Sequence, residues 1–468
     1  MLLGEGFLLL LSGGAMFVVI SRAAGPDLLG EYSLVLAWMM LAGGLASFGI
    51  PEFIMREIGR LEVAAARHTA HGLLIGTVFS LVATLGMAVA VRLLDYAGPL
   101  RDALSIASLG LLPVTTAAIC RSGFIARRQM HFVLAVAACE SAIVAGINTV
   151  LVLTGHGIVA LTTTLVAGKA IASALALFLL HRNVVPLRAT FDRAFARELL
   201  GPIVTLGLLN ALGMVSMRIN TIMLSMWGSM TVVGHYAVAT KLTEIALIGP
   251  SLFNQLMLPR LARRYATGSR HALGGLEASV ASFFALAIPS GVGVIVFAEP
   301  ILTLIFGGPF ADAAMVLRVL MVCFLLDCFD GLLAVVLRAA CRQDVDLRAY
   351  AANPVINVLT NFLTIPPWGG VGAAVAKLIA TLCSASLRTW AVAREVASVG
   401  WFRLVAKPAV IALVAAGGTL PFLSTASGLW LAAAYALACA LLLVATRAFS
   451  FHAIKATLAD PGDRPASG

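Results

Sequence analysis

Charged residues are scarce in this sequence. Only 12% of its 468 residues are Asp, Glu, Lys or Arg, whereas 60% are hydrophobic, and the mean hydropathy is +0.99. No polar stretch is long enough to fold into a separate soluble domain. A water-soluble core could not bury this much apolar side chain, so the bilayer is the solvent that fits the composition. We therefore predict an all-α polytopic membrane protein.

Signatures of catalytic and metal sites are also absent. The sequence has no Walker A loop, no Gly-x-Ser-x-Gly and no His-Glu-x-x-His, and its seven cysteines show no Cys-x-x-Cys spacing. We predict a protein that is not an enzyme, with no cofactor, metal or disulfide. The net charge is +10, but the basic residues are dispersed rather than gathered on one face, so we predict no nucleic-acid partner.

About fourteen apolar runs follow one another along the chain. Each is near the roughly 20 residues that a helix needs to cross a bilayer. We predict transmembrane helices at approximately 4–21, 31–53, 71–91, 102–120, 132–154, 157–180, 199–225, 232–256, 276–298, 315–337, 349–366, 370–393, 405–424 and 427–446.

The connectors between these runs alternate in charge. One side, which includes Arg121, Arg338 and Arg388, collects 24 of the 32 Lys and Arg, against Arg22, Arg92 and Arg101 on the other. Because basic connectors stay in the cytoplasm, this pattern predicts that both termini are cytoplasmic.

The sequence repeats weakly with an offset of six spans. Gly30-x-Tyr32 recurs 204 residues later as Gly234-x-Tyr236, and each motif is followed by a pair of arginines. Gly157-Ile-Val-Ala160 recurs 213 residues later as Gly370-Val-Gly-Ala373, and Asn148 pairs with Asn361 at the same offset. Parallel repeats of this kind suit alternating access, in which two bundles rock around a site between them.

The repeat predicts the domain organisation. Two pseudo-symmetric six-helix lobes are followed by two further helices. The predicted parts are an N-lobe at 1–180, a cytoplasmic linker at 181–198, a C-lobe at 199–393, appended spans at 394–449 and a cytoplasmic tail at 450–468.

One segment resembles a known family. Residues 21–33 read Ser-Arg-Ala-Ala-Gly-Pro-Asp-Leu-Leu-Gly-Glu-Tyr-Ser, and Phe48-Gly49-Ile50-Pro51 and Arg56-Glu57 follow. The segment resembles the O-antigen and exopolysaccharide flippases of the multidrug/oligosaccharidyl-lipid/polysaccharide exporter superfamily, whose pattern is Arg-x-Leu-Gly-Pro…Phe-Gly-x-Tyr-Ser. Ala24 replaces the Leu of that pattern, and Leu29 replaces the Phe.

The resemblance implies a fold and a function. The fold would be that of the multidrug exporters known as MATE transporters. The protein would move an undecaprenyl-pyrophosphate-linked oligosaccharide from the cytoplasmic to the periplasmic leaflet of a bacterial inner membrane. Its partners would be this polyprenyl lipid, membrane lipids, a coupling ion (H⁺ or Na⁺) and glycan assembly proteins. We interpret the motif residues as structural: Gly30 and Gly234 would allow a tight helix entry, and Arg22, Arg56 and Arg60 would anchor helix ends at lipid headgroups.

Buried bases are the candidates for binding the substrate. A charge at the centre of a membrane helix costs about 2.5–3.5 kcal/mol, so such residues need a role or a partner. Arg218, eight residues after Asn210, is the strongest candidate, because a guanidinium can donate two hydrogen bonds to one phosphate. An ion pair with an acid on a neighbouring helix is the alternative. The predicted substrate-binding residues are Arg218, Lys241, Lys169, Lys377 and Asn210.

Buried acids are the candidates for ion coupling. Asp327 and Asp330 share one face of a span, where low dielectric disfavours two charges. The alternative for them is pairing with Lys377 or an arginine. Lys241 and Glu244 are three residues apart and could form a structural pair. The predicted coupling residues are Asp327, Asp330, Glu140 and Glu244.

Two other functions stay open at this point. A cation-coupled multidrug exporter would share the fold, but such exporters usually have twelve spans and a more acidic cavity. A membrane glycan polymerase or ligase would usually expose a sizeable outer loop, whereas the longest outer loops here, near 92–101 and 299–314, are short.

Overall fold

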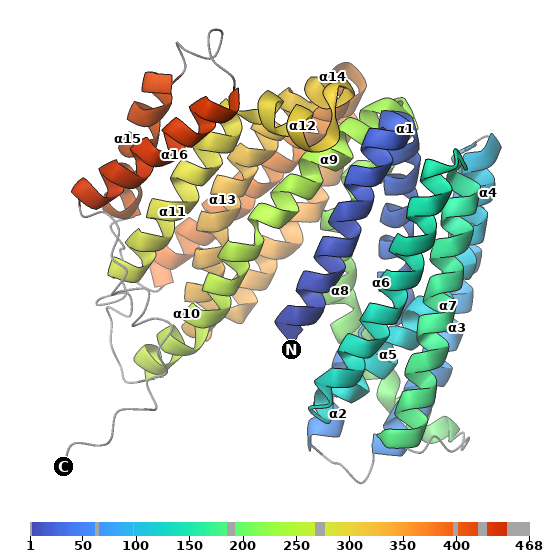
Figure 1. Ribbon diagram of the computed structural model, residues 1–468. Coiled ribbons are helices and arrows are strands. Elements are labelled where there is room, and N and C mark those ends of the chain that lie inside the picture. The colour runs from blue at the N-terminus through green and yellow to red at the C-terminus, as the bar shows by residue number, and fades with distance from the viewer. Residues whose placement is uncertain are drawn as a thin grey trace. The chain divides into compact units, whose positions relative to one another are not determined.

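The fold is described from a computed structural model. The structure describes residues 2–60, 65–96, 98–184, 192–266, 277–395, 401–419 and 428–446, and their regular secondary structure is helical (Figure 1). Within these ranges, nine helices are long and apolar enough to cross a membrane, and α15 and α16 contain shorter apolar segments. The predicted all-α multi-pass membrane fold is confirmed.

The chain divides into two compact units, Met1–Ala237 and Val238–Gly468. The helices of the first unit are α1 (Leu2–Ser47), α2 (Ile50–Arg60), α3 (Ala65–Leu93), α4 (Gly98–Leu109), α5 (Leu111–Ala126), α6 (Met130–Leu153), α7 (Ile158–Asn183), α8 (Arg193–Trp227) and the first half of α9 (Met230–Ala246).

The second unit contains the rest of α9 and the helices that follow it. They are α10 (Ile248–Ala266), α11 (Glu277–Val296), α12 (Ala298–Phe306), the 3₁₀ helix η2 (Gly308–Ala313), α13 (Ala314–Ala339), α14 (Gln343–Glu395), α15 (Trp401–Thr419) and α16 (Gly428–Ala445).

The predicted spans fall on these helices, but several neighbours are joined. The first two spans form one helix, α1, and the eleventh and twelfth form α14. Each joint is a glycine in a left-handed or related conformation that side chains disfavour: Gly25 has φ +80° and Gly369 has φ +52°. Prolines lie beside both joints, at Pro26 and at Pro366 and Pro367.

The 204-residue repeat is visible as a reciprocal contact inside the first unit. A Cβ placed on Gly30 would overlap the carbonyl oxygen of Met230, and a Cβ on Gly234 would overlap the carbonyl oxygen of Pro26. The Thr231 hydroxyl also donates a hydrogen bond to the Asp27 carboxylate, 204 residues away, at 2.5 Å.

This contact corrects one interpretation of the motif. Gly30 and Gly234 do not form tight helix entries. They lie within α1 and α9 and let the two helix backbones approach each other, whereas the bend of the chain falls at Gly25.

The second repeat also marks equivalent positions. Gly157 directly precedes α7, and Gly370 follows the joint at Gly369 that opens the second part of α14. Asn148 is fully buried and donates a hydrogen bond to the carbonyl of Leu161 at 3.4 Å. Its repeat partner Asn361 is fully buried as well.

The compact units do not coincide with the predicted lobes, because α8 packs against α1 and α2 of the first unit. The lobes were defined by the repeat, and that division stays a prediction. Parts of the predicted linker and all of the predicted tail, residues 185–191 and 450–468, lie outside the described residues.

Each unit has its own arrangement of helices. In the first, α1 contacts α3, α5, α6 and α8, and α6 and α7 run side by side (Figure 1). In the second, α13 contacts α10, α11 and α14. The central position of α13 explains why most of its apolar side chains are buried.

Candidate functional site

The first unit contains an open cavity of about 590 Å³. Its walls come from α1, α5, α6, α7 and α8, and most of the lining side chains are apolar. Two glycines of α1, Gly43 and Gly44, form part of the wall and leave room beside the helix. Three charged side chains line this cavity among the described residues, namely Arg121, Glu140 and Lys169.

Glu140 and Lys169 form an ion pair in this cavity. The Lys169 Nζ donates to the Glu140 Oε1 at 2.7 Å, and the two residues come from adjacent helices, α6 and α7. Their side chains are 24% and 23% exposed, so the pair is accessible from the cavity rather than sealed in the protein. Two of the predicted site residues are therefore brought together at a cavity wall.

Arg121 adds a second base to the same cavity. It lies on α5, and its side chain is exposed. The charge pattern of the sequence predicts that Arg121 is a connector base, so it is not among the predicted site residues. Only the packing of α5 against α7 reveals that it lines the same cavity as Lys169.

The second unit contains the remaining predicted pairs. On α9, the Lys241 Nζ lies 3.7 Å from the Glu244 Oε2, as the structural interpretation of this pair predicted. Between α13 and α14, the Lys377 Nζ lies 3.9 Å from the Asp327 Oδ2. Thr381 donates a long hydrogen bond of 3.5 Å to the other oxygen of Asp327.

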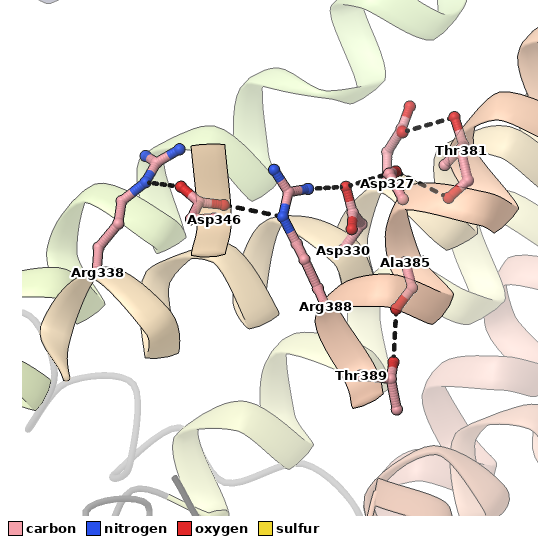
Figure 2. Close-up of polar contacts among 9 residues, drawn as sticks. Asp327, Asp330, Arg338, Asp346, Thr381, Ala385, Arg388 and Thr389 are labelled. Atoms are coloured by element: carbon pink, nitrogen blue, oxygen red, sulfur yellow. Dashed lines mark hydrogen bonds and ion pairs between the residues drawn. The ribbon is translucent and has the colours of Figure 1, made fainter. Parts of the chain in front are cut away.

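Asp330 belongs to a different network, in which Arg388 is the central residue. Figure 2 shows the Arg388 guanidinium between two carboxylates, Asp330 on α13 and Asp346 near the start of α14. Its Nε donates to the Asp346 Oδ1 at 2.9 Å, and its Nη1 contacts the Asp330 Oδ2. Arg338 donates to the second oxygen of Asp346 at 2.7 Å, and Ser384 donates to Asp330 at 3.4 Å.

Arg388 is not a connector residue. The charge pattern of the sequence predicts a connector position for it, but it lies inside α14 with only 5% of its side chain exposed. The predicted span 370–393 already contained this position, and α14 ends at Glu395, so the error lay in grouping Arg388 with the connector bases. Three polar side chains of α14 contact the acids of α13, and they lie within seven residues of one another: Thr381, Ser384 and Arg388. This helical spacing is the sequence signal that could have identified Arg388 as a partner of those acids.

Arg218 and Asn210 both lie on α8 and are half-buried. Met214, between them in sequence, lines the cavity of the first unit, but neither Asn210 nor Arg218 belongs to the described lining. Arg218 lies in the first compact unit and Lys241 in the second.

The charges of the described membrane helices thus differ in their surroundings. Glu140 and Lys169 face a cavity with one hydrogen-bond partner each, whereas Arg388 and its two carboxylates are enclosed and have several partners. An accessible pair can exchange a partner for a ligand, while an enclosed network fixes the helices around it.

A family model described as "Polysaccharide biosynthesis protein" matches residues 11–264, which is more than half of the chain. The chain belongs to this family. The resemblance carried by residues 21–57 is confirmed, and the match covers the cavity and the Lys169–Glu140 pair.

One curated relative is the probable low-salt glycan biosynthesis flippase Agl15 of Haloferax volcanii. It is 26% identical over 148 residues, which are 31% of this chain and 31% of that protein. The chain thus matches about a third of the relative's length.

Solved structures share the fold over nearly the whole chain. The lipid II flippase MurJ in an inward closed conformation has a TM-score of 0.79 at 13% identity, with 96% of this chain and 98% of that chain covered. An inward-facing multidrug resistance MATE family transporter of the MOP superfamily has a TM-score of 0.64 at 18% identity, with 85% and 95% covered. The predicted MATE-like fold is therefore confirmed.

Proposed function

We propose that this protein is a flippase that moves a polyprenyl-pyrophosphate-linked oligosaccharide from the cytoplasmic to the periplasmic leaflet of the inner membrane. The observation that carries the proposal is the cavity of the first unit, where Lys169 and Arg121 interrupt an otherwise largely apolar wall. A pyrophosphate is an anion that must pass through hydrocarbon, and bases at membrane depth lower the cost of its transfer.

Family membership supports the same substrate class. The family is named for polysaccharide biosynthesis, and the curated relative Agl15 is described as a probable glycan biosynthesis flippase. The similar solved structures include a flippase of lipid II, which is also a lipid-linked saccharide. We assign Lys169 to substrate binding, with Arg121 as a second contact, and keep Arg218, Asn210, Lys241 and Lys377 as further candidates.

The mechanism that we propose is alternating access. The reciprocal contact around Gly30 and Gly234 supports a pseudo-two-fold relation between the repeated helices, and the fold is shared with exporters. The basic connectors support a cytoplasmic location of both termini. The membrane potential or an ion gradient would drive the cycle, with Glu140, Glu244 and Asp327 as the acids that carry the coupling ion. Asp330, which was also a candidate, is held in the enclosed Arg388 network instead.

Deletion of the gene tests this proposal in the cell that makes the polysaccharide. We expect that surface polysaccharide disappears and that the lipid-linked oligosaccharide accumulates in the cytoplasmic leaflet. Re-expression of the wild-type protein should restore the surface glycan, whereas Lys169→Ala should not. Normal surface glycan in the deletion strain would contradict the proposal.

A multidrug exporter is the alternative within the same fold. It would confer resistance to cationic drugs when overexpressed, and a drug-susceptibility panel measures this directly. We expect unchanged drug susceptibility. Glu140, Glu244, Asp327 and Asp330 each lie beside a lysine or arginine, and that base would compete with a cationic drug for the carboxylate.

A further inference from the structure

We infer that Glu140 is an exchangeable counter-ion of the substrate site: a phosphate oxygen of the ligand displaces it from Lys169, and the displaced carboxylate binds one proton. The inference rests on the proposed flippase function, and it concerns how the site handles charge.

The ammonium group of Lys169 is incompletely coordinated. An ammonium has three N–H donors, but Lys169 uses one of them, in the 2.7 Å bond to the Glu140 Oε1. No further hydrogen-bond partner of Lys169 lies among the described residues. Two donor positions are therefore available for first contact with the oxygens of an anion, and the like charge of the bound anion then repels the Glu140 carboxylate from Lys169.

Lys169 is more accessible than Arg388. That guanidinium is also paired with acids, but its side chain is only 5% exposed, and it bridges two carboxylates from two helices. A ligand could not reach it without separating α13 from α14. Lys169, in contrast, is 23% exposed at the wall of a cavity of about 590 Å³.

The charge balance of the site differs between its ligand-free and ligand-bound states. Without ligand, Glu140 neutralises Lys169, so the empty carrier need not reorient an uncompensated base in the bilayer. With ligand, the phosphate neutralises Lys169 and leaves Glu140 without its counter-ion. A carboxylate alone in an apolar cavity is costly and becomes neutral by binding a proton from water.

The charges that face Glu140 agree with this exchange. Lys169 approaches it from α7, Arg121 lines the same cavity from α5, and Tyr32 of α1 lies within electrostatic range. The α8 side chain in the lining, Met214, is uncharged. Once a phosphate holds Lys169, the described cavity lining offers Glu140 one other base, Arg121, which the same phosphate attracts.

The balance of the step is one proton per bound anion. The Lys169–Glu140 hydrogen bond breaks, a hydrogen bond from Lys169 to a phosphate oxygen forms, and one proton moves from water to the Glu140 carboxylate. The loaded site then carries one negative charge fewer than the ligand alone. Release of the ligand restores the ion pair and returns the proton.

The test uses the purified full-length protein in detergent, with undecaprenyl pyrophosphate that bears no sugar as the probe. Binding is titrated in weak buffer with a pH indicator, and the dissociation constant is measured across a pH series. For the wild type we expect uptake of about one proton per bound lipid, and therefore an affinity that falls by up to about tenfold for each unit of rising pH.

Two variants make the result specific. Glu140→Gln should bind the lipid without proton uptake and with little pH dependence. Asp102→Asn, which alters an exposed acid 4.0 Å from Arg101, is the matched control and should behave like the wild type. Equal proton uptake by wild type and Glu140→Gln would overturn the inference, and so would a failure of the wild type to bind the lipid.

The outcome is separable from that of the proposed function. Flipping of the complete glycolipid in proteoliposomes is measured on the same preparations. Flipping by the wild type without proton uptake on binding refutes the counter-ion exchange but leaves the flippase intact. Proton-linked binding of the lipid without flipping supports the exchange and refutes the flippase.

Discussion

Two ionic sites of this protein have the same pair of charges but different surroundings. Glu140–Lys169 and Asp330–Arg388 each pair an acid with a base inside a membrane helix bundle. The first pair faces a cavity, and each member has one hydrogen-bond partner. The second is enclosed and extended by Asp346 and Arg338 (Figure 2), and Ser384 donates a further hydrogen bond to Asp330. Accessibility and number of partners, rather than the presence of charge, separate a site that can exchange ligands from one that holds helices together.

The largest effect on stability should come from removing the centre of the enclosed network. Arg388→Ala leaves Asp330 and Asp346 buried without their shared base, and breaking a buried ion pair in this way costs about 3–5 kcal/mol. We expect a large fall in the thermal unfolding midpoint of the detergent-solubilised protein. Asp330→Asn combined with Asp346→Asn should restore part of the stability of Arg388→Ala, because no carboxylate is then left uncompensated.

The accessible pair should affect ligand binding more than stability. Lys169→Ala removes a charge-assisted hydrogen bond to the ligand, worth about 1.5–3 kcal/mol or roughly 10- to 150-fold in affinity for a lipid pyrophosphate. The unfolding midpoint should fall less than in Arg388→Ala, since the Glu140 left behind is partly exposed to the cavity. A variant that lost stability like Arg388→Ala while keeping its affinity would abolish the distinction between the two sites.

The repeat contact should have an intermediate effect on stability. Gly234→Ala places a methyl group against the carbonyl of Pro26, where backbone must move, and we expect a loss of about 1–3 kcal/mol. Gly86 on α3 has no atom near its would-be Cβ and provides the control. Gly86→Ala should be neutral in the same thermal unfolding measurement, and equal effects of the two substitutions would show that the backbones do not meet at Gly234.

The smallest effect on stability should come from Asp192, which precedes α8 and caps its first turn. Hydrogen bonds from the backbone N–H groups of Phe195 and Ala194, together with Arg67, lower the pKa of Asp192 from its ordinary 3.8. A lowered carboxyl pKa contributes stability above pH 3.8 and loses it as the pH falls through the lowered value. The midpoint difference between wild type and Asp192→Ala should therefore shrink on acidification, and a difference that is constant with pH would contradict this role.

Much of the fold could be predicted from the sequence, because bilayer thickness sets the length of each apolar run. The joints at Gly25 and Gly369 could not be predicted. Hydrophobicity gives the length of each span, but it does not show whether two consecutive spans are joined as one helix or separated by a loop. Close pairs such as Lys241 and Glu244 follow from helical spacing. Glu140 and Lys169 are 29 residues apart on different helices, and Arg388 is 58 residues from Asp330, so only packing reveals these partners.

The most direct test of this account is flipping of a fluorescent polyprenyl-pyrophosphate oligosaccharide in proteoliposomes of the purified protein. We predict that the wild type moves the lipid between leaflets, that Lys169→Ala is slower by at least about tenfold, and that Asp102→Asn matches the wild type. If Lys169→Ala flips the lipid at the wild-type rate, the cavity of the first unit is not the path of the pyrophosphate.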